Sequence, residues 1–585
     1  MRWSAARRRE RQFFYRPLFL ASAEAAVRIR DEQRSSRMKV GEAIAEIMKR
    51  EGVEILTAYP VNHLIEFAAA IDIRPIIVRQ ERVGLHMADA ISRLTSGDKL
   101  GAFCMQHGPG TENAYGGIAQ AYSESIPILV VPGGYPRRTA QVGANYSATR
   151  EMRGIAKIAE SVVLPAEIQN IMRRAFSALR NGRGGPAIVE VPVDLWNAEI
   201  EGELDYKPVV RTKMGPDPAA VREAAKLLAG AKSPVIYAGQ GVHWAKAWPQ
   251  LKQLAELLAI PVCTSLEGKS AFPETHKLSL GSGGVAVPKP VRHWLDRADV
   301  IFGVGCSFTE TAFGVPMPKD KSKKFIHATL DPNHLNKDIY ATIGLVGDAG
   351  LTLDALLAEL GKTEKKPRDA AKVASEISEM RQGWLKEWMP KLTSNDAPLT
   401  PYRVIWDLMH TVDVANTIIT HDAGSPRDQL SPFWVSETPL SYIGWGKTTQ
   451  LGYGLGLAMG AKLVHPDKLC INVWGDAAIG FTGMDFETAV RNQIPIMSVL
   501  FNNFSMAIEL AVMPVSTKKY RATDISGDYA AMARAFGGHG ERVTAPGEII
   551  PAIKRGIEQT RKGVPVLLEF ITAKETTISR YLPEK

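Results

Sequence analysis

Cysteine is scarce in this sequence. Four cysteines occur among 585 residues, at positions 104, 263, 306 and 470, and no two of them form a Cys-x-x-Cys pair. This wide spacing disfavours a structural zinc site and a disulfide framework, and it suits a reducing compartment. We therefore expect a cytoplasmic protein, with Cys104 and Cys470 buried in the apolar runs that contain them.

Long apolar runs are also absent. No stretch of about 20 apolar residues occurs, so we expect no membrane-spanning helix and no membrane partner. With 45% hydrophobic and 23% charged residues, the composition is that of a soluble globular protein. The chain is longer than the roughly 250–300 residues at which single cores stop growing, so we expect several domains.

Net positive charge is small outside the first 37 residues. Residues 1–37 hold ten arginines and four acidic residues, which give +6 of the formal net charge of +9. Because the excess is confined to this basic N-terminal extension, we expect no nucleic-acid partner. The extension is a poor secretory signal, since its apolar part contains Glu24, although a targeting peptide stays open. We interpret it as upstream sequence or a disordered arm, with Met38 as the natural start.

Short apolar runs alternate with longer amphipathic segments in three blocks. This alternation is typical of βα units and parallel sheets. We predict an α/β protein with three doubly wound parallel-sheet domains at 38–200, 219–360 and 395–575. Polar segments at 201–218 and 361–372 are the predicted linkers.

Two polar turns in the third block carry the clearest chemical signal. One apolar run ends at Gly475-Asp476, and the next ends at Asn502-Asn503. The carboxyl ends of parallel strands meet at one edge of a sheet, so Asp476 and Asn503 can converge on one cation. Mg²⁺ takes few protein oxygens and completes its shell with phosphates and water. The alternative is an ordinary loop with a helix-capping aspartate.

The segment from Gly475 to Asn503 resembles the metal and diphosphate motif of thiamine diphosphate (ThDP) enzymes. The resemblance spans about 38–575 and is greatest to the acetolactate synthase group. It implies ThDP and Mg²⁺ as cofactors, with pyrimidine-binding, central and diphosphate-binding domains in that order. It also implies that the backbone carbonyl of Ser505 is a third protein ligand of the metal. Ala477 stands where the family usually has glycine.

The resemblance also assigns roles to residues outside that motif. Glu81 matches the catalytic glutamate that contacts N1′ of the aminopyrimidine, although a glutamate at a helix start is often a surface charge. Gln106 and His107 are expected to face the substrate and to act in catalysis, although a lone histidine is often structural. Leu451 matches the apolar residue that forces the family's cofactor into its V-shaped conformation. The implied cofactor-binding set is Gly108, Asn113, Gly424, Ser425, Thr449, Leu451, Gly475, Ala477 and Ala478.

The central block carries a weaker pattern. Its strand-Gly-x-Gly segment at 238–241 lacks the full G-x-G-x-x-G fingerprint, which argues against an NAD(P) oxidoreductase. Central domains of the resembled family sometimes hold FAD or ADP. Such a nucleotide is possible here but not predicted; its contacts would lie near Gly305-Cys306-Ser307 and Asp331-Pro332.

The implied activity is ThDP- and Mg²⁺-dependent cleavage or formation of C–C bonds next to a carbonyl. The most similar group decarboxylates a 2-oxo acid and ligates the product, in a homodimer or tetramer with sites between subunits. The segment 143–150 lacks that group's Phe-Gln-Glu run, and the segment after Asn503 lacks its Trp-Gln run. A 2-oxo acid or acyl-CoA decarboxylase or 2-hydroxyacyl lyase therefore stays open, as does a non-catalytic ThDP-binding regulatory paralogue.

Overall fold

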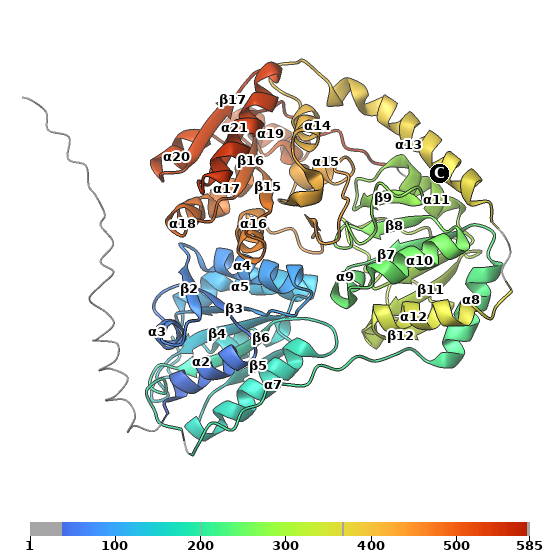
Figure 1. The fold of residues 1–585 in the computed structure, drawn as a ribbon. Helices are drawn as coiled ribbons and strands as arrows, with labels where there is room; N and C mark the ends of the chain where they lie inside the picture. The colour runs from blue at the N-terminus through green and yellow to red at the C-terminus, as the bar shows by residue number, and fades with distance from the viewer. Residues whose placement is uncertain (1–37, 201, 365–367, 582–585) are drawn as a thin grey trace, which may run out of the picture.

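The computed structural model describes residues 38–200, 202–364 and 368–581, so the basic extension 1–37 lies outside the described residues. Within these ranges the chain forms three α/β domains, each around a six-stranded parallel sheet (Figure 1). The predicted fold class is confirmed. None of the helices in the described ranges is long and apolar enough to cross a membrane.

The first sheet has the strand order β2-β1-β3-β4-β6-β5. Every residue of β3 and β4 is buried, as expected where helices cover both faces of a parallel sheet. The strands are β1 Ile55–Ala58, β2 Arg74–Ile77, β3 Gly101–Met105, β4 Ile128–Gly134, β5 Ile158–Ser161 and β6 Ala187–Pro192. The helices are α2 Val40–Arg50, α3 Leu64–Ala69, α4 Glu81–Leu94, α5 Pro109–Glu124, α6 Ala148–Glu151 and α7 Ile168–Arg180.

The central sheet has a different order, β12-β11-β10-β7-β8-β9. Its strands are β7 Pro234–Ala238, β8 Val262–Ser265, β9 Ser279–Gly283, β10 Val300–Val304, β11 Lys324–Thr329 and β12 Ile343–Val346. The helices around it are α8 Pro218–Gly230, α9 Gly241–Ala245, α10 Trp248–Leu258, α11 Lys289–Arg297 and α12 Ala349–Leu360.

The third sheet has the order β14-β13-β15-β16-β18-β17, which repeats the order of the first sheet. Its strands are β13 Thr417–His421, β14 Tyr442–Ile443, β15 Leu469–Gly475, β16 Met497–Asn502, β17 His539–Val543 and β18 Val566–Ile571. Its helices are α14 Pro401–Thr411, α15 Ser425–Leu430, α16 Tyr453–Val464, α17 Asp476–Thr482, α18 Phe486–Arg491, α19 Pro514–Tyr520, α20 Tyr529–Ala535 and α21 Ile549–Arg561.

A 23-residue helix, α13 Ala370–Leu392, connects the central and third domains along one side of the molecule (Figure 1). The segment 361–372, predicted as a linker, overlaps its first turn. The ring of Trp384 stacks on Phe433 of the third domain at 5.0 Å between centroids. Only four residues of α13 are buried, and the rest of the helix is largely polar. The sequence pattern therefore did not predict this packing.

Helices α4 and α16 form the contact between the first and third domains (Figure 1). The contact is close because α16 has glycines where α4 crosses it. A Cβ atom at Gly456 would lie 2.9 Å from the carbonyl oxygen of Val83, and one at Gly460 would lie 2.5 Å from that of Met87. One apolar core therefore runs through both domains.

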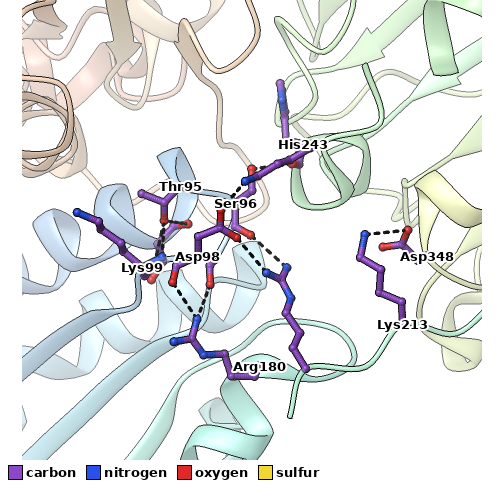
Figure 2. Close-up of polar contacts among 12 residues, drawn as sticks. Thr95, Ser96, Asp98, Lys99, Arg180, Lys213, His243 and Asp348 are labelled. Atoms are coloured by element: carbon purple, nitrogen blue, oxygen red, sulfur yellow. Dashed lines mark hydrogen bonds and ion pairs between the residues drawn. The ribbon is translucent and has the colours of Figure 1, made fainter. Parts of the chain in front are cut away.

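The first and central domains meet through polar groups (Figure 2). The buried Ser96 hydroxyl donates to the His243 carbonyl of the central domain at 2.8 Å. Within the first domain, Arg180 holds the same loop by donating to the carbonyls of Gly97 and Asp98 at 2.7 and 3.0 Å. The Asp98 carboxylate pairs with Arg211 and Lys246 at the solvent-exposed side of this junction.

Candidate active site

Asp476 and Asn503 lie together at the carboxyl edge of the third sheet. Asp476 is the first residue of α17, after β15, and Asn503 follows β16, the next strand in the sheet. The Asp476 Oδ2 atom accepts hydrogen bonds from the backbone N–H groups of Asn503 and Ser505, both at 3.1 Å. Two turns 27 residues apart are thus joined through one carboxylate.

This pair suits a hard cation. The Asn503 Oδ1 atom is buried and has no hydrogen-bond partner, so it is an oxygen donor in need of a ligand. Burial raises the pKa of Asp476, while four backbone N–H groups that point at its carboxylate oppose that rise. A cation would offset the desolvation of the carboxylate and complete the coordination of Asn503. No cluster of three or more His, Cys, Asp or Glu side chains suited to a metal ion occurs in the described ranges.

A cavity of about 100 Å³ lies beside this pair. We call it the diphosphate cradle. It is lined by nine of the residues predicted for cofactor and metal: Gly424, Ser425, Leu451, Gly475, Asp476, Ala477, Ala478, Asn503 and Ser505. Gly424 has a φ of +81° and precedes α15, while α17 begins at Asp476, so two helix starts border the cradle. Thr449 does not line the cradle.

Asp422 shapes the cradle, and the sequence analysis did not assign it a role. Its carboxylate accepts from the backbone N–H groups of Ala423, Gly452 and Gly454 at 2.8 to 2.9 Å. Burial raises the pKa of Asp422 to about 6, although those three donors lower it. The side chain therefore ties the start of α16, beside Leu451, to the end of β13. Its position at a predicted strand end was the available signal.

Glu81 begins α4 in the first domain, as the strand–Glu–helix pattern predicts. Its side chain is 2% exposed. Burial raises the pKa of Glu81, and hydrogen bonds from its own backbone and from the Asn113 side chain oppose the rise. A buried carboxyl with a raised pKa keeps its proton to a higher pH than a surface glutamate at a helix start does.

Gln106, His107 and Gly108 form the turn between β3 and α5. Gly108 has a φ of +62°, a left-handed conformation that glycine adopts readily. Burial lowers the pKa of His107. None of Glu81, Gln106, His107, Gly108 or Asn113 lines the diphosphate cradle of the same chain. The structure thus gathers the predicted residues into two groups, one for each outer domain.

A much larger cavity, of about 590 Å³, lies at the carboxyl edge of the central sheet. Gly305, Cys306, Ser307 and Asp331 line it, at the positions where a nucleotide contact was considered. Its volume falls within the range of small-molecule sites. Charged residues of both signs line it, among them Arg183, Lys213, Lys447, Arg580, Glu267, Asp331 and Asp348.

The segment 444–451, which we call the strap, runs between the two cavities. Lys447 lines the central cavity, and Leu451 lines the cradle. The buried Glu124 carboxylate of α5 accepts from the backbone N–H groups of Gly446 and Lys447 at 3.0 and 2.9 Å. Burial, together with the charge of Glu267, raises the pKa of Glu124 to about 7. The first domain therefore holds the strap in place.

Comparison with known families gives three matches, in the order of the three sheets. The model described as "Thiamine pyrophosphate enzyme, N-terminal TPP binding domain" matches residues 38–154. The model of the central domain of the same enzymes matches 221–356, and that of the C-terminal TPP binding domain matches 422–570.

Whole-chain relatives extend the match. The chain is 31% identical over 560 residues to a protein of Methanocaldococcus jannaschii named "Probable acetolactate synthase large subunit", covering 91% of this chain and 92% of that protein. A protein of the same name from Methanococcus aeolicus is 29% identical, with coverage of 93% and 94%. The "Acetolactate synthase isozyme 3 large subunit" of Escherichia coli is 27% identical, with coverage of 90% and 94%.

Proposed function

Because the chain belongs to the thiamine pyrophosphate enzymes and is acetolactate synthase-like, we propose that it decarboxylates a 2-oxo acid and ligates the product to a second carbonyl compound, with ThDP and Mg²⁺. The observation that carries the proposal is the cradle. There Asp476 binds the backbone of Asn503, and the Asn503 Oδ1 atom is buried without a partner.

The residues of the cradle have separable tasks. Asp476 and Asn503 hold the cation, and the Ser505 carbonyl is the proposed third ligand. The helix starts at Gly424 and Asp476 orient the diphosphate through backbone N–H groups. Leu451, which lines the cradle, would support the ring system of the cofactor, and the Thr449 carbonyl would accept from the amino group of that ring system. Bound ThDP supplies the nucleophilic carbon and the electron sink for cleavage next to a carbonyl.

Glu81 handles the proton. Its carboxyl is buried, and with ThDP bound it would hold a proton on Oε for a ring nitrogen of the cofactor. The raised pKa of Glu81 keeps that proton available nearer to neutral pH than an exposed glutamate would. Gln106 and His107 are proposed to face the substrate from the neighbouring turn.

A second copy of the chain is needed to bring these tasks together. The cradle contains no residue of the first domain. Two large apolar side chains that line the cradle, Met506 and Ile508, are 40% and 48% exposed, which favours coverage by a partner. We propose a homodimer, or a tetramer built from it, in which Glu81 of one subunit serves the cradle of the other.

Reducing conditions fit the cysteines. All four are free and buried. The proposed location is the cytoplasm.

The test combines binding with turnover. Isothermal titration with ThDP and MgCl₂ should show binding to the unmodified protein and to Glu81→Gln, and loss of binding in Asp476→Ala and Asn503→Ala. Product mass spectrometry with a panel of 2-oxo acids, alone and with added aldehydes or a second 2-oxo acid, should show ligated products. Products of decarboxylation without ligation, or cleavage of a 2-hydroxyacyl-CoA, would instead establish the lyase alternative. Binding without turnover of any substrate would establish the regulatory paralogue.

A further inference from the structure

The connection from β4 to α6, residues 135–147, contains part of one of the two segments in which the sequence departs from the acetolactate synthase pattern. It follows the carboxyl end of β4 and therefore lies at the same sheet edge as Gln106 and His107. Residues 141–144 are all exposed, whereas both ends of the connection are half-buried. A connection exposed in its middle and held at both ends can present fixed side chains beside a site.

Two carboxylates of the β6 end fix this connection. Asp194 accepts from the backbone N–H and the Nε of Arg137 at 3.0 and 2.8 Å. Glu190, which is 5% exposed, accepts from the Ser147 hydroxyl at 2.7 Å and from the Ala148 N–H at 2.9 Å. Hydrogen bonds to a buried carboxylate are stronger than neutral ones, so Glu190 sets the Ser147 end firmly. The Asp194–Arg137 pair at the other end is 37% and 44% exposed, so it adds less.

Tyr135 and Tyr146, at the two ends of this connection, contact the turn that carries His107. The Tyr135 ring meets the His107 ring edge-on, at 4.7 Å between centroids and 64° between planes. A Cβ atom at Gly108 would lie 2.6 Å from the Tyr135 hydroxyl, so that hydroxyl is close to the Gly108 backbone. The Tyr146 hydroxyl donates to the Gly108 carbonyl at 2.6 Å, and the Glu112 backbone N–H donates to the same carbonyl at 3.0 Å.

We propose that Tyr135 and Tyr146 are positioning residues that hold the Gln106-His107-Gly108 turn in the orientation in which His107 meets the acyl substrate. The inference rests on the proposed function, since it assumes that His107 faces that substrate. Tyr146 fixes the backbone, because its hydroxyl holds the carbonyl of a left-handed glycine. Tyr135 fixes the ring, because it occupies one edge of the imidazole.

The charged and titratable groups around the turn fit this arrangement. Glu112 of α5 lies beside the Tyr146 hydroxyl, and burial, followed by the Glu112 charge, raises the pKa of Tyr146. That phenol therefore stays protonated and remains a donor. Burial is the cause of the lowered pKa of His107. The Tyr135 ring contributes to that burial, so the imidazole is offered in its neutral form, with one nitrogen as donor and one as acceptor.

The experiment uses the full-length protein with Tyr146→Phe, Tyr135→Leu and, as the control, Tyr340→Phe, which changes a tyrosine of the central domain that is 79% exposed. The first readout is independent of activity: the rate at which diethyl pyrocarbonate modifies His107, followed by peptide mass spectrometry from pH 5 to 8. Tyr135→Leu should raise this rate several-fold and move its midpoint upward toward pH 6.5. Tyr340→Phe should change neither quantity.

The second readout is turnover. Tyr146→Phe removes one hydrogen bond of ordinary strength, so kcat should fall about three- to tenfold while ThDP affinity stays within twofold. Unchanged His107 reactivity in Tyr135→Leu, or a lowered melting temperature with unchanged kcat in Tyr146→Phe, would overturn the proposal. Failure of the unmodified protein to bind ThDP would overturn the proposed function instead, and the modification rates would still decide whether Tyr135 shields His107.

Discussion

The first and third domains have the same strand order but carry different chemistry at the same edge of the sheet. In the third sheet, the turn after β15 carries Asp476, and the turn after the neighbouring strand carries Asn503. In the first sheet, the corresponding turns after β3 and β4 carry His107 and Tyr135. The same strand order thus provides oxygen ligands in the third domain, and imidazole and phenol groups in the first domain. The fold positions these side chains, and the residues at the strand ends decide what they do.

The largest effect on activity should come from placing a Glu81 variant and an Asp476 variant in different chains of one dimer. Glu81→Gln alone should lower kcat by about 10²- to 10⁴-fold with cofactor binding kept, and Asp476→Ala alone should abolish binding. In a heterodimer of the two variants, purified through two different tags, one intact site of two should form, with about half of the normal activity. Sites contained within single chains would leave this heterodimer as inactive as its parents.

The contact between the two domains gives the next largest effect. Gly456→Ala places a methyl group against the α4 backbone near Val83, which should destabilise the protein by about 1–3 kcal/mol or more. The matched control is Gly383→Ala in α13, where an added Cβ would meet nothing within 4 Å. That change should stabilise the protein slightly, by up to about 1 kcal/mol. Melting temperatures by calorimetry compare the two, and equal shifts would contradict the close crossing of α4 and α16.

A buried carboxylate at the same contact has a pH-dependent effect. Asp485 Oδ1 accepts from the Arg79 backbone N–H of the first domain at 2.8 Å, while its Oδ2 is buried without a partner. Burial raises the pKa of Asp485 to about 6 from 3.8. The folded state therefore binds this proton more tightly than the unfolded state, so stability falls as pH rises through the window from about 4 to 6.

Asp485→Asn should remove the fall in stability that ionisation of Asp485 causes as the pH rises. We expect about 1–3 kcal/mol of stabilisation above pH 7, shrinking as the pH is lowered toward 5. Melting temperatures between pH 5 and 8 measure it, with Asp72→Asn as the control because the Asp72 side chain is 94% exposed. A variant that is less stable than the unmodified protein at pH 8 would show that the charge of Asp485 is needed at this contact.

The smallest effect is expected where the first domain meets the central one (Figure 2). Asp98 pairs with Arg211 and Lys246, and all three side chains are 38% to 54% exposed. Solvent screens such pairs, so Asp98→Asn should change stability by less than about 1 kcal/mol, and 1 M salt should cancel the change. Ser96→Ala, which removes a buried donor to the His243 carbonyl, should lower the stability by more than Asp98→Asn does. The reverse ranking would contradict this account of the junction.

The sequence predicted what depends on neighbours in the chain. Apolar runs that end in polar residues placed Asp476 and Asn503 at strand ends, and the strand–Glu–helix pattern placed Glu81 at the start of α4. Contacts between distant segments were not predictable in this way. Tyr146 reaches Gly108 across 38 residues, and Glu124 reaches Lys447 across 323. Helix α13 was missed because its buried positions are few and widely spaced.

The strap has a practical consequence for anyone who alters this protein. Lys447 and Leu451 are about one helical turn's worth of sequence apart, yet they belong to the walls of two different cavities. A compound or substitution that displaces the strap backbone beside the larger cavity would also move Leu451, the apolar side chain at the proposed cofactor site. Inhibitor screens aimed at either space should therefore record occupancy of both.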